Sequence, residues 1–175
     1  MKYLVISCSH KPESRSRIFA QMALKQLQAT RLAAEFVDLA TLNLPMCDAS
    51  SCYALPAVKR IGEQIAAARG IIVAAPIYNY DLNAAAKNLV ELTGDSWNDK
   101  IVGFICAAGG QGSYMSVMPF ANSLMLDFRC VIIPRFVYAP DNANDDEAIG
   151  GAAIHRRIEG LTAELARMTE ALFPD

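Results

Sequence analysis

Apolar residues occur along this chain in two patterns, as short continuous runs and as longer stretches with helical spacing. Continuous apolar runs bounded by polar residues are typical of strands that are buried on both faces of a sheet. These runs predict five strands, at residues 3–7, 35–39, 70–75, 101–107 and 131–138. The helical spacing predicts helices at residues 18–27, 57–68, 82–92 and 114–128, and a last helix that follows a polar loop at 141–146 and ends near 172.

Strands and helices of this length in strict alternation predict parallel strands joined by right-handed crossovers. The expected fold class is α/β, a doubly wound parallel sheet between two layers of helices. Five strands favour the flavodoxin-like order 2-1-3-4-5 over the six-stranded dinucleotide-binding fold. Two prolines modify the pattern, since Pro119 should lie near the first turn of its helix or kink it, and Pro134 could interrupt the fifth strand. We expect residues 1–175 to form a single domain.

Composition and charge exclude several function classes. Hydrophobic residues make up 53% of the chain, enough for a substantial core, and the formal net charge is -2. A chain with this balance lacks the basic surface that nucleic acids and anionic membranes attract. The apolar stretch at the start is too short for a signal peptide or a membrane span, so we expect a cytoplasmic protein.

Five cysteines are present, and an odd number without a secretion signal argues against a disulfide framework. Cys106 and Cys130 lie in apolar runs and should be buried. Cys47 and Cys52 lie in the longest irregular stretch, residues 40–56, which could border a site or a partner. With only two histidines in the chain, we expect no metal site.

In sheets of this kind, ligands bind beyond the carboxyl ends of the strands, near the point where the strand order reverses. For the predicted order, the relevant loops follow the first, third and fourth strands. They are residues 9–16, 76–80 and 108–112. All three loops are unusual in composition, so the candidate site is where they meet.

The first loop combines three hydroxyl groups with two cations. Its candidate ligand-binding residues are Ser9, Lys11, Ser14, Arg15 and Ser16. The loop opens a helix, where unpaired backbone N–H groups and the helix dipole favour an anion such as a phosphate. The alternative is structural, with Ser14 or Ser16 as an ordinary N-cap in a solvated turn.

The other two loops suit a planar ligand. The second loop joins a rigid turn to two aromatic rings and an amide, in Pro76, Ile77, Tyr78, Asn79 and Tyr80. Such residues can offer hydrogen bonds to the edge of a ring and an apolar wall beside it. The third loop, Gly109, Gly110, Gln111 and Gly112, has few Cβ atoms and lets the backbone approach a ligand closely. Alone, the second loop could equally be two surface tyrosines near a turn, and the third an ordinary glycine-rich turn.

Two other chemistries fit the first loop less well. Low-molecular-weight phosphatases place a cysteine, five residues and an arginine after the first strand of a similar sheet, whereas six residues separate Cys8 from Arg15 here. Asp141 could serve such an enzyme as general acid. A response-regulator receiver needs clustered acids at the end of the first strand, and this chain has none there.

Together the three loops resemble those of the NADPH-dependent FMN reductase family. The first motif of that family, Gly-Ser-x-Arg-x-x-Ser-x-Asn, matches at Ser9 and Ser14. Cys8, Lys11 and Ser16 replace its glycine, arginine and asparagine. The second motif, Pro-x-Tyr-Asn-Tyr followed by Leu-Lys-Asn in a helix, is the strongest match. The matching residues are Pro76, Tyr78, Asn79, Tyr80, Lys87 and Asn88, with Ala86 in place of leucine. The third motif matches at residues 108–110.

The resemblance implies an oxidoreductase that passes electrons from NADPH or NADH through FMN to a small acceptor. The acceptor could be a quinone, an azo compound, a metal oxyanion or free flavin. By the same resemblance, the first loop would bind the FMN phosphate with Arg15 at its rim. Residues 76–80 would line the ribityl chain and the ring, and residues 109–112 would contact the isoalloxazine edge. Lysine in place of arginine at position 11 keeps the charge but loses the forked geometry.

No catalytic acid or base is expected, because the flavin carries the chemistry. Members of the family pair beside the flavin, so a homodimer or homotetramer is expected. The helix at 82–92 is the candidate surface, with Leu82, Ala85, Ala86, Leu89 and Val90 as its apolar residues. The alternative is that these residues pack on the sheet alone. A flavodoxin-type electron carrier remains the alternative function, although such carriers have a strongly acidic face and the net charge here is only -2.

Overall fold

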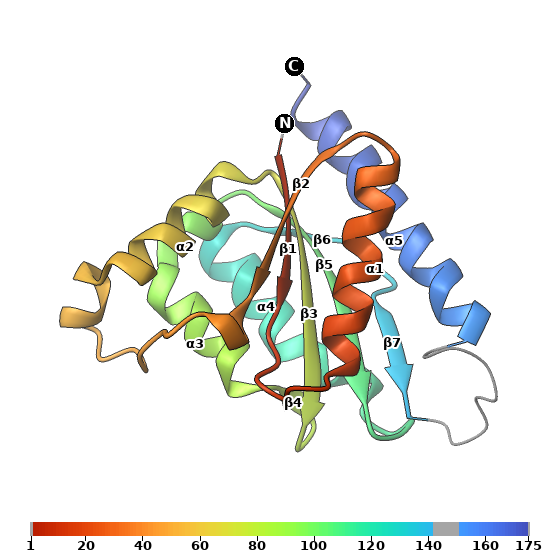
Figure 1. Ribbon diagram of the computed structural model, residues 1–175. Helices are drawn as coiled ribbons and strands as arrows, with labels where there is room; N and C mark the ends of the chain where they lie inside the picture. Colours follow the sequence, from red (N-terminus) through yellow and green to blue (C-terminus); the bar gives the residue numbers. More distant parts are fainter. Residues whose placement is uncertain (1, 142–150, 175) are drawn as a thin grey trace.

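A parallel β-sheet runs through the centre of the molecule, with helices on both of its faces (Figure 1). The computed structural model describes residues 2–141 and 151–174. Strands follow the order β2-β1-β3-β5-β6, and β7 also pairs with β5. The parallel strands are β1 (Lys2–Ser7), β2 (Ala33–Asp38), β3 (Gly70–Tyr78), β5 (Ile101–Ala108), β6 (Val131–Ile132) and β7 (Val137–Pro140). This confirms the predicted flavodoxin-like fold and its strand order.

The burial of the strands follows their place in the sheet. All eight residues of β5 are buried, as are the first eight of β3. Along the edge strand β2, exposed and partly buried residues alternate up to Phe36, and only Val37 is buried. Within β1, Leu4 and Ile6 face one core cluster while Tyr3 and Val5 face the other, because successive side chains of a strand point to opposite faces.

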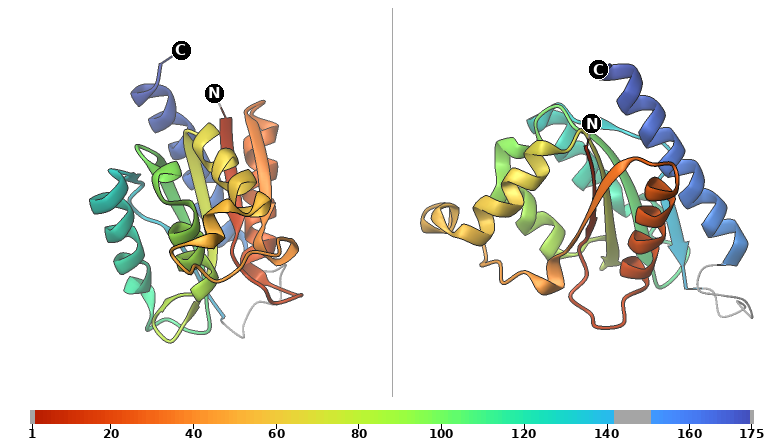
Figure 2. Two further views of the ribbon diagram at one scale, coloured as in Figure 1. Left: turned by 90° about the vertical axis from the view of Figure 1, so that its left-hand side faces the viewer. Right: turned by 45° about the horizontal axis from the view of Figure 1, so that its top comes forward.

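Two helix layers cover those two faces (Figure 2). Helices α1 (Arg15–Ala29) and α5 (Gly151–Leu172) pack on one face through residues such as Phe19 and Leu165. Helices α2 (Pro56–Ala67), α3 (Ala84–Thr93) and α4 (Met118–Phe128) pack on the other through residues such as Ile61, Leu89 and Leu124. Short 3₁₀ helices complete the chain: η1 (Leu39–Thr41), η2 (Ser51–Ala54), η3 (Gly94–Trp97) and η4 (Tyr114–Val117).

Pro134 interrupts the predicted fifth strand, and the helix predicted at 114–128 begins only at Met118, after a 3₁₀ turn. The predicted fifth strand is divided into β6 and β7, with Pro134 between them, because proline cannot donate to the ladder. Pro119 lies in the first turn of α4, where its missing N–H costs nothing. The loop expected at residues 141–146 lies outside the described residues except for Asp141.

The helix predicted at residues 82–92 begins two residues later than expected. A short strand β4 (Asp81–Leu82) turns back and pairs antiparallel with the end of β3. The apolar face of α3 is occupied within the chain, since Leu82, Ala86, Leu89 and Val90 are buried in the core and Ala85 packs against it. Packing on the sheet therefore accounts for the residues that suggested a subunit interface.

No helix within residues 2–141 and 151–174 is both long enough and apolar enough to span a membrane.

Candidate functional site

The three predicted loops meet at the carboxyl edge of the sheet, at the lower end of the strands in Figure 1. The Cys8 backbone N–H donates to the Ala74 carbonyl over 2.9 Å, which joins the first loop to β3. A Cβ atom built on Gly112 would lie 3.6 Å from the Tyr80 hydroxyl, so the second and third loops are neighbours. The end of β7 closes the group, because the Asp141 N–H donates to the Ala108 carbonyl over 2.8 Å.

The three serine side chains of the first loop point inward. Ser9, Ser14 and Ser16 are only 1%, 5% and 1% exposed. The Ser14 and Ser16 hydroxyls are hydrogen-bonded to each other at 2.9 Å, and the Ser9 hydroxyl accepts from the Lys11 N–H at 3.2 Å. Ser14 holds the N-cap position of α1, but its side chain makes no capping hydrogen bond. The first-turn N–H groups of α1 are therefore available to an anion. In the structural alternative, a simple serine cap would accept a hydrogen bond from one of them.

The two predicted cations of this loop differ in their surroundings. Lys11 is exposed, and its ammonium group has no ion-pair partner among the described residues. The Arg15 guanidinium instead donates to the Pro140 carbonyl over 2.9 Å and lies 3.3 Å from the Asp141 carboxylate. Arg15 thus connects the first loop to the end of β7 and stands at the border of the loop cluster.

Arg17 shapes the first loop and was not among the predicted site residues. Its guanidinium donates to the carbonyls of Ser9 and Lys11, each over 2.8 Å, and to that of Pro12 over 2.6 Å. It also forms an ion pair of 2.6 Å with Asp38 at the end of β2. The sequence carried one sign of this contact, because Arg17 lies in the first turn of α1 and Asp38 ends the neighbouring strand β2.

The second loop is a tight turn between β3 and β4. Its two central residues, Asn79 and Tyr80, have φ angles of 52° and 63°. Two-residue hairpin turns with both central residues at positive φ usually contain glycine, so this turn stores backbone strain, and strain of this kind concentrates at functional sites. Pro76 and Ile77 are buried beneath the turn, whereas Tyr78 and Tyr80 are 53% and 72% exposed.

Asn83 joins the second loop to the first. Its side-chain amide donates to the Cys8 carbonyl over 2.7 Å, and its backbone N–H donates to Pro76 over 3.2 Å. The Asn83 side-chain oxygen and the neighbouring Ser7 hydroxyl are buried without a partner among the described residues. Unpaired polar atoms are uncommon in protein interiors and here lie beneath the predicted site.

The third loop is held from one side and open on the other. A Cβ atom on Gly109 or Gly110 would meet nothing within 4 Å. The Tyr138 hydroxyl donates a hydrogen bond to the Gly110 carbonyl and accepts from the Ser113 hydroxyl at 2.8 Å. Gln111 and Gly112 are exposed. The hydrogen bond from Tyr138 therefore fixes the backbone at Gly110, while the space above Gly109 and Gly110 stays free of side chains.

A family model described as NADPH-dependent FMN reductase matches residues 1–145. The chain belongs to the NADPH-dependent FMN reductase family. It is 25% identical to an NADPH azoreductase of Bacillus sp. (strain OY1-2) over 171 residues, which cover 95% of this chain and 93% of that protein. It is also 25% identical to an NAD(P)H-dependent FAD/FMN reductase of Geobacillus thermodenitrificans (strain NG80-2) over 138 residues, 77% of this chain and 74% of that protein.

Solved structures agree on the fold. The flavoenzyme NAD(P)H:(acceptor) oxidoreductase FerB of Paracoccus denitrificans has a TM-score of 0.79 at 18% identity, with 97% of each chain covered. An oxidoreductase of Corynebacterium diphtheriae has a TM-score of 0.77 at 19% identity, with 98% of each chain covered. The protein is thus an oxidoreductase of the NAD(P)H-dependent flavin reductase family, as the loops predicted.

Cys8 does not suit the phosphatase alternative. Burial, and secondarily the charge of Asp38, raise the pKa of its thiol far above the ordinary value. A nucleophilic cysteine needs the opposite shift, because the thiolate is the attacking species. The family assignment and this environment agree that Cys8 is a small residue packed at the end of β1.

Two further residues of the family's second motif lie on α3, away from the loop cluster. Asn88 accepts from the Cys47 N–H over 2.8 Å and donates to the Pro45 carbonyl over 2.9 Å. Lys87 is exposed and lies 3.7 Å from Glu91. In this member of the family, Asn88 therefore fixes the irregular segment before η2.

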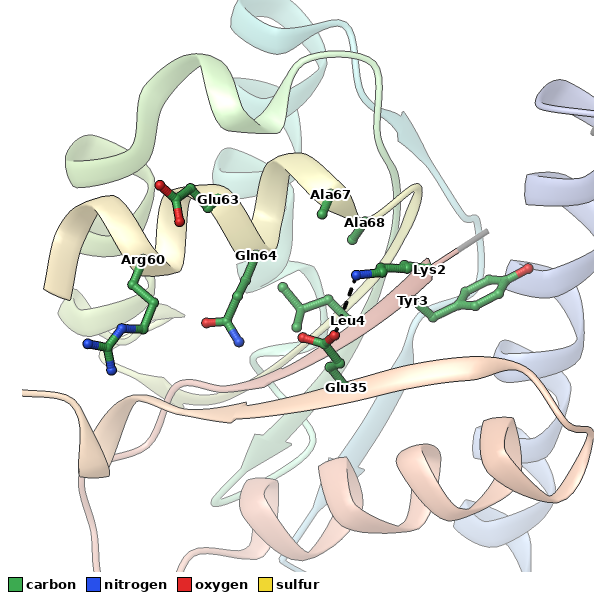
Figure 3. A pocket seen from close by; sticks show the side chains of 9 residues that line it. All are labelled: Lys2, Tyr3, Leu4, Glu35, Arg60, Glu63, Gln64, Ala67 and Ala68. Carbon is green, nitrogen blue, oxygen red and sulfur yellow. Dashed lines mark ion pairs between the residues drawn. The ribbon is translucent and has the colours of Figure 1, made fainter. Parts of the chain in front are cut away.

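A hollow of about 270 Å³ lies at the opposite, amino-terminal edge of the sheet, between β1, β2 and α2 (Figure 3). Lys2 and Glu35 form an ion pair of 3.9 Å across it, and Arg60 and Gln64 border it from α2. None of the predicted site residues lines this hollow. In sheets of this order ligands bind at the carboxyl edge, so the hollow is not the candidate ligand site.

Proposed function

We propose that the chain binds FMN at the carboxyl edge of its sheet and transfers electrons from NADPH or NADH to a small acceptor. The observation that carries the proposal is the cluster of Ser9, Ser14 and Ser16, three nearly buried hydroxyls at an uncapped helix start. Hydroxyl and N–H donors of this kind match the oxygens of a phosphate. The exposed Tyr78 and Tyr80 side chains of the second loop supply aromatic surface for a ring.

The first loop would hold the phosphate. The three hydroxyls and the first-turn N–H groups of α1 supply neutral donors, and the unpaired Lys11 ammonium supplies charge. Arg15 is engaged with Pro140 and Asp141, which supports a role at the rim rather than at the centre. Since lysine lacks the forked geometry of arginine, the backbone and hydroxyl donors should contribute most of the phosphate binding.

The second and third loops would hold the remainder of the cofactor. Pro76, Ile77, Tyr78, Asn79 and Tyr80 would line the ribityl chain and ring, and Gly109, Gly110, Gln111 and Gly112 would contact the edge of the isoalloxazine. The proximity of Gly112 to Tyr80 supports two adjoining walls of one site. The hydrogen bond from Tyr138 keeps the glycine loop in place, so a ring could lie against its bare backbone.

When bound, FMN supplies the redox chemistry between the nicotinamide and the acceptor. The protein's own part is to bind and orient, and no side chain of the site is assigned as a proton donor. The acceptor classes proposed are quinones, azo compounds, metal oxyanions and free flavin. The similarity to the Bacillus NADPH azoreductase supports testing an azo compound first.

A homodimer or homotetramer remains a proposal based on the family. The apolar residues of α3 are used inside the chain, so an interface would use other surfaces. Exposed apolar side chains gather instead along η4 and α4, at Met115, Met118, Met125 and Leu126. Sedimentation velocity at several protein concentrations would test the assembly, and a monomer at all of them would refute it.

Flavin titration of the purified chain tests the proposed function. We expect added FMN to bind with quenching of its fluorescence, and anaerobic NADPH to bleach the bound flavin. Absence of FMN binding would refute the proposal. Binding without bleaching by NADPH or NADH would favour the flavodoxin-type electron carrier instead.

A further inference from the structure

Two cysteines outside the proposed flavin site face each other in the irregular segment between η1 and α2. The Sγ atoms of Cys47 and Cys52 are 3.9 Å apart. A disulfide bond is about 2.05 Å long, so the sulfurs need to approach by about 2 Å, within the range of side-chain rotation. Among the described residues, no group of three or more histidine, cysteine or carboxylate side chains could hold a metal ion, which leaves the two thiols as a pair.

The chain between Cys47 and Cys52 is folded so that their sulfur atoms lie close together. Asp48 accepts hydrogen bonds from the Ser50 N–H over 2.9 Å and the Cys52 N–H over 3.1 Å, and from the Ser51 hydroxyl over 2.7 Å. Asn88 on α3 holds the other end through the Cys47 N–H. The short distance between the sulfurs is thus built by side-chain to backbone hydrogen bonds on both sides of the turn.

The two thiols have different surroundings. Cys47 is half-buried, and its sulfur lies 3.6 Å from the Tyr53 hydroxyl. The hydrogen bond from Tyr53 lowers the pKa of Cys47 and stabilises the thiolate. Cys52 is 2% exposed and packs with Val58 and Leu92. Burial, followed by its hydrogen bond with Asp48, raises the pKa of Cys52.

The other three cysteines are protected from oxidation. Cys8, Cys106 and Cys130 are all buried. Burial raises the pKa of Cys106 to about 12 and that of Cys130 to about 11, and it raises the pKa of Cys8 further. Because oxidants react with exposed thiolates, Cys47 is the residue at which a peroxide would react first.

We propose that Cys47 and Cys52 form a reversible intramolecular disulfide, in which Cys47 is oxidised first and Cys52 resolves it. The Cys47 thiolate attacks one oxygen of hydrogen peroxide and the O–O bond breaks. Cys47 becomes a sulfenic acid, and the departing hydroxide takes up the proton that Cys47 had released, giving water. The Cys52 sulfur then attacks the Cys47 sulfur and the S–O bond breaks. The hydroxyl group leaves with the Cys52 proton as a second water.

The two thiols together lose two electrons, and the peroxide gains them. A small dithiol such as dithiothreitol returns both cysteines to thiols by exchange through a mixed disulfide. The pair lies outside the three ligand loops, so the proposal does not depend on flavin binding.

Peptide mapping of the full-length protein tests the pair. Trypsin cleaves after Arg31 and Lys59 and releases one peptide, residues 32–59, that carries both cysteines. After brief treatment with hydrogen peroxide, we expect the mass of this peptide to fall by two hydrogens. Its cysteines should not be alkylated by N-ethylmaleimide until dithiothreitol is added. Oxidation of the exposed Met46 in the same peptide adds an oxygen and is not reversed by dithiothreitol, so the two reactions are distinguishable.

Three variants sharpen the test. Cys52→Ser should block the loss of two hydrogens and leave a Cys47 sulfenic acid that dimedone traps. Cys47→Ser should abolish both signals, and Cys130→Ser, the matched control, should leave the disulfide unchanged. The proposal is overturned if peptide 32–59 keeps two reactive thiols after the treatment. It is also overturned if Cys8, Cys106 or Cys130 is oxidised before Cys47.

Discussion

Replacement of Arg17 by methionine should loosen the first loop and weaken FMN binding together. The substitution keeps most of the aliphatic stem but removes the hydrogen bonds to three loop carbonyls and the ion pair with Asp38. Both side chains of that pair are only 14% exposed. Removing one partner of a buried pair costs about 3–5 kcal/mol, and the residual exposure here puts the expected loss of unfolding free energy at about 2–4 kcal/mol.

A second variant separates the effect of the loop hydrogen bonds from the effect of the ion pair. Asp38→Asn removes the pair's charge but leaves the three hydrogen bonds from Arg17 to the loop. This variant should lose unfolding free energy while its FMN affinity per folded molecule stays within about threefold of the parent. Arg17→Met should lose FMN affinity by about tenfold or more, since the carbonyls of Ser9, Lys11 and Pro12 then lose the hydrogen bonds that hold the loop backbone in place.

Urea denaturation gives the unfolding free energies, and fluorescence titration gives the FMN dissociation constants. This role of Arg17 is refuted if Arg17→Met binds FMN as tightly as Asp38→Asn does. In that case the phosphate would lie elsewhere, or the serines would be positioned without Arg17.

Three further outcomes are expected. Ser14→Asp should weaken FMN binding by at least about tenfold, because it places a carboxylate against the phosphate, whereas Ser14→Ala should have a smaller effect; equal titration curves for the two variants would argue against the site. Gly103→Val should lower the unfolding free energy by about 1–3 kcal/mol, because a Cβ there would lie 2.8 Å from Leu161, and an unchanged urea midpoint would contradict this packing. Since the Tyr53 hydrogen bond lowers the pKa of Cys47, Tyr53→Phe should shift the pH profile of Cys47 alkylation by iodoacetamide to higher pH, and an unshifted profile would contradict that role.

The sequence allowed the sheet to be predicted well because its central strands are buried on both faces. Runs such as residues 70–75 and 101–107 have no polar position that could place them elsewhere. The interruption at Pro134 was equally predictable, since the constraint is local to one residue. The predicted strand order alone was enough to place the three ligand loops together at the carboxyl edge of the sheet.

Features that depend on contacts between distant residues escaped prediction. Arg17 binds carbonyls five to eight residues away and a carboxylate 21 residues away, and its residue type alone does not reveal this. The β3–β4 hairpin was missed because its turn contains Asn79 and Tyr80 where glycine usually signals positive φ. For the apolar residues of α3, a partner surface and packing on the sheet were both open, because spacing cannot distinguish a helix face that meets the sheet from one that meets a second chain; the structure shows packing on the sheet.

The division of the outer strand into β6 and β7 affects how copies of this chain can associate. A continuous edge strand presents an unbroken row of backbone donors and acceptors, on which a strand of another molecule can add. Here the row is two residues, a gap containing Pro134, and four residues. A second copy cannot extend the sheet across that break, so this end of the sheet is protected against edge-to-edge aggregation.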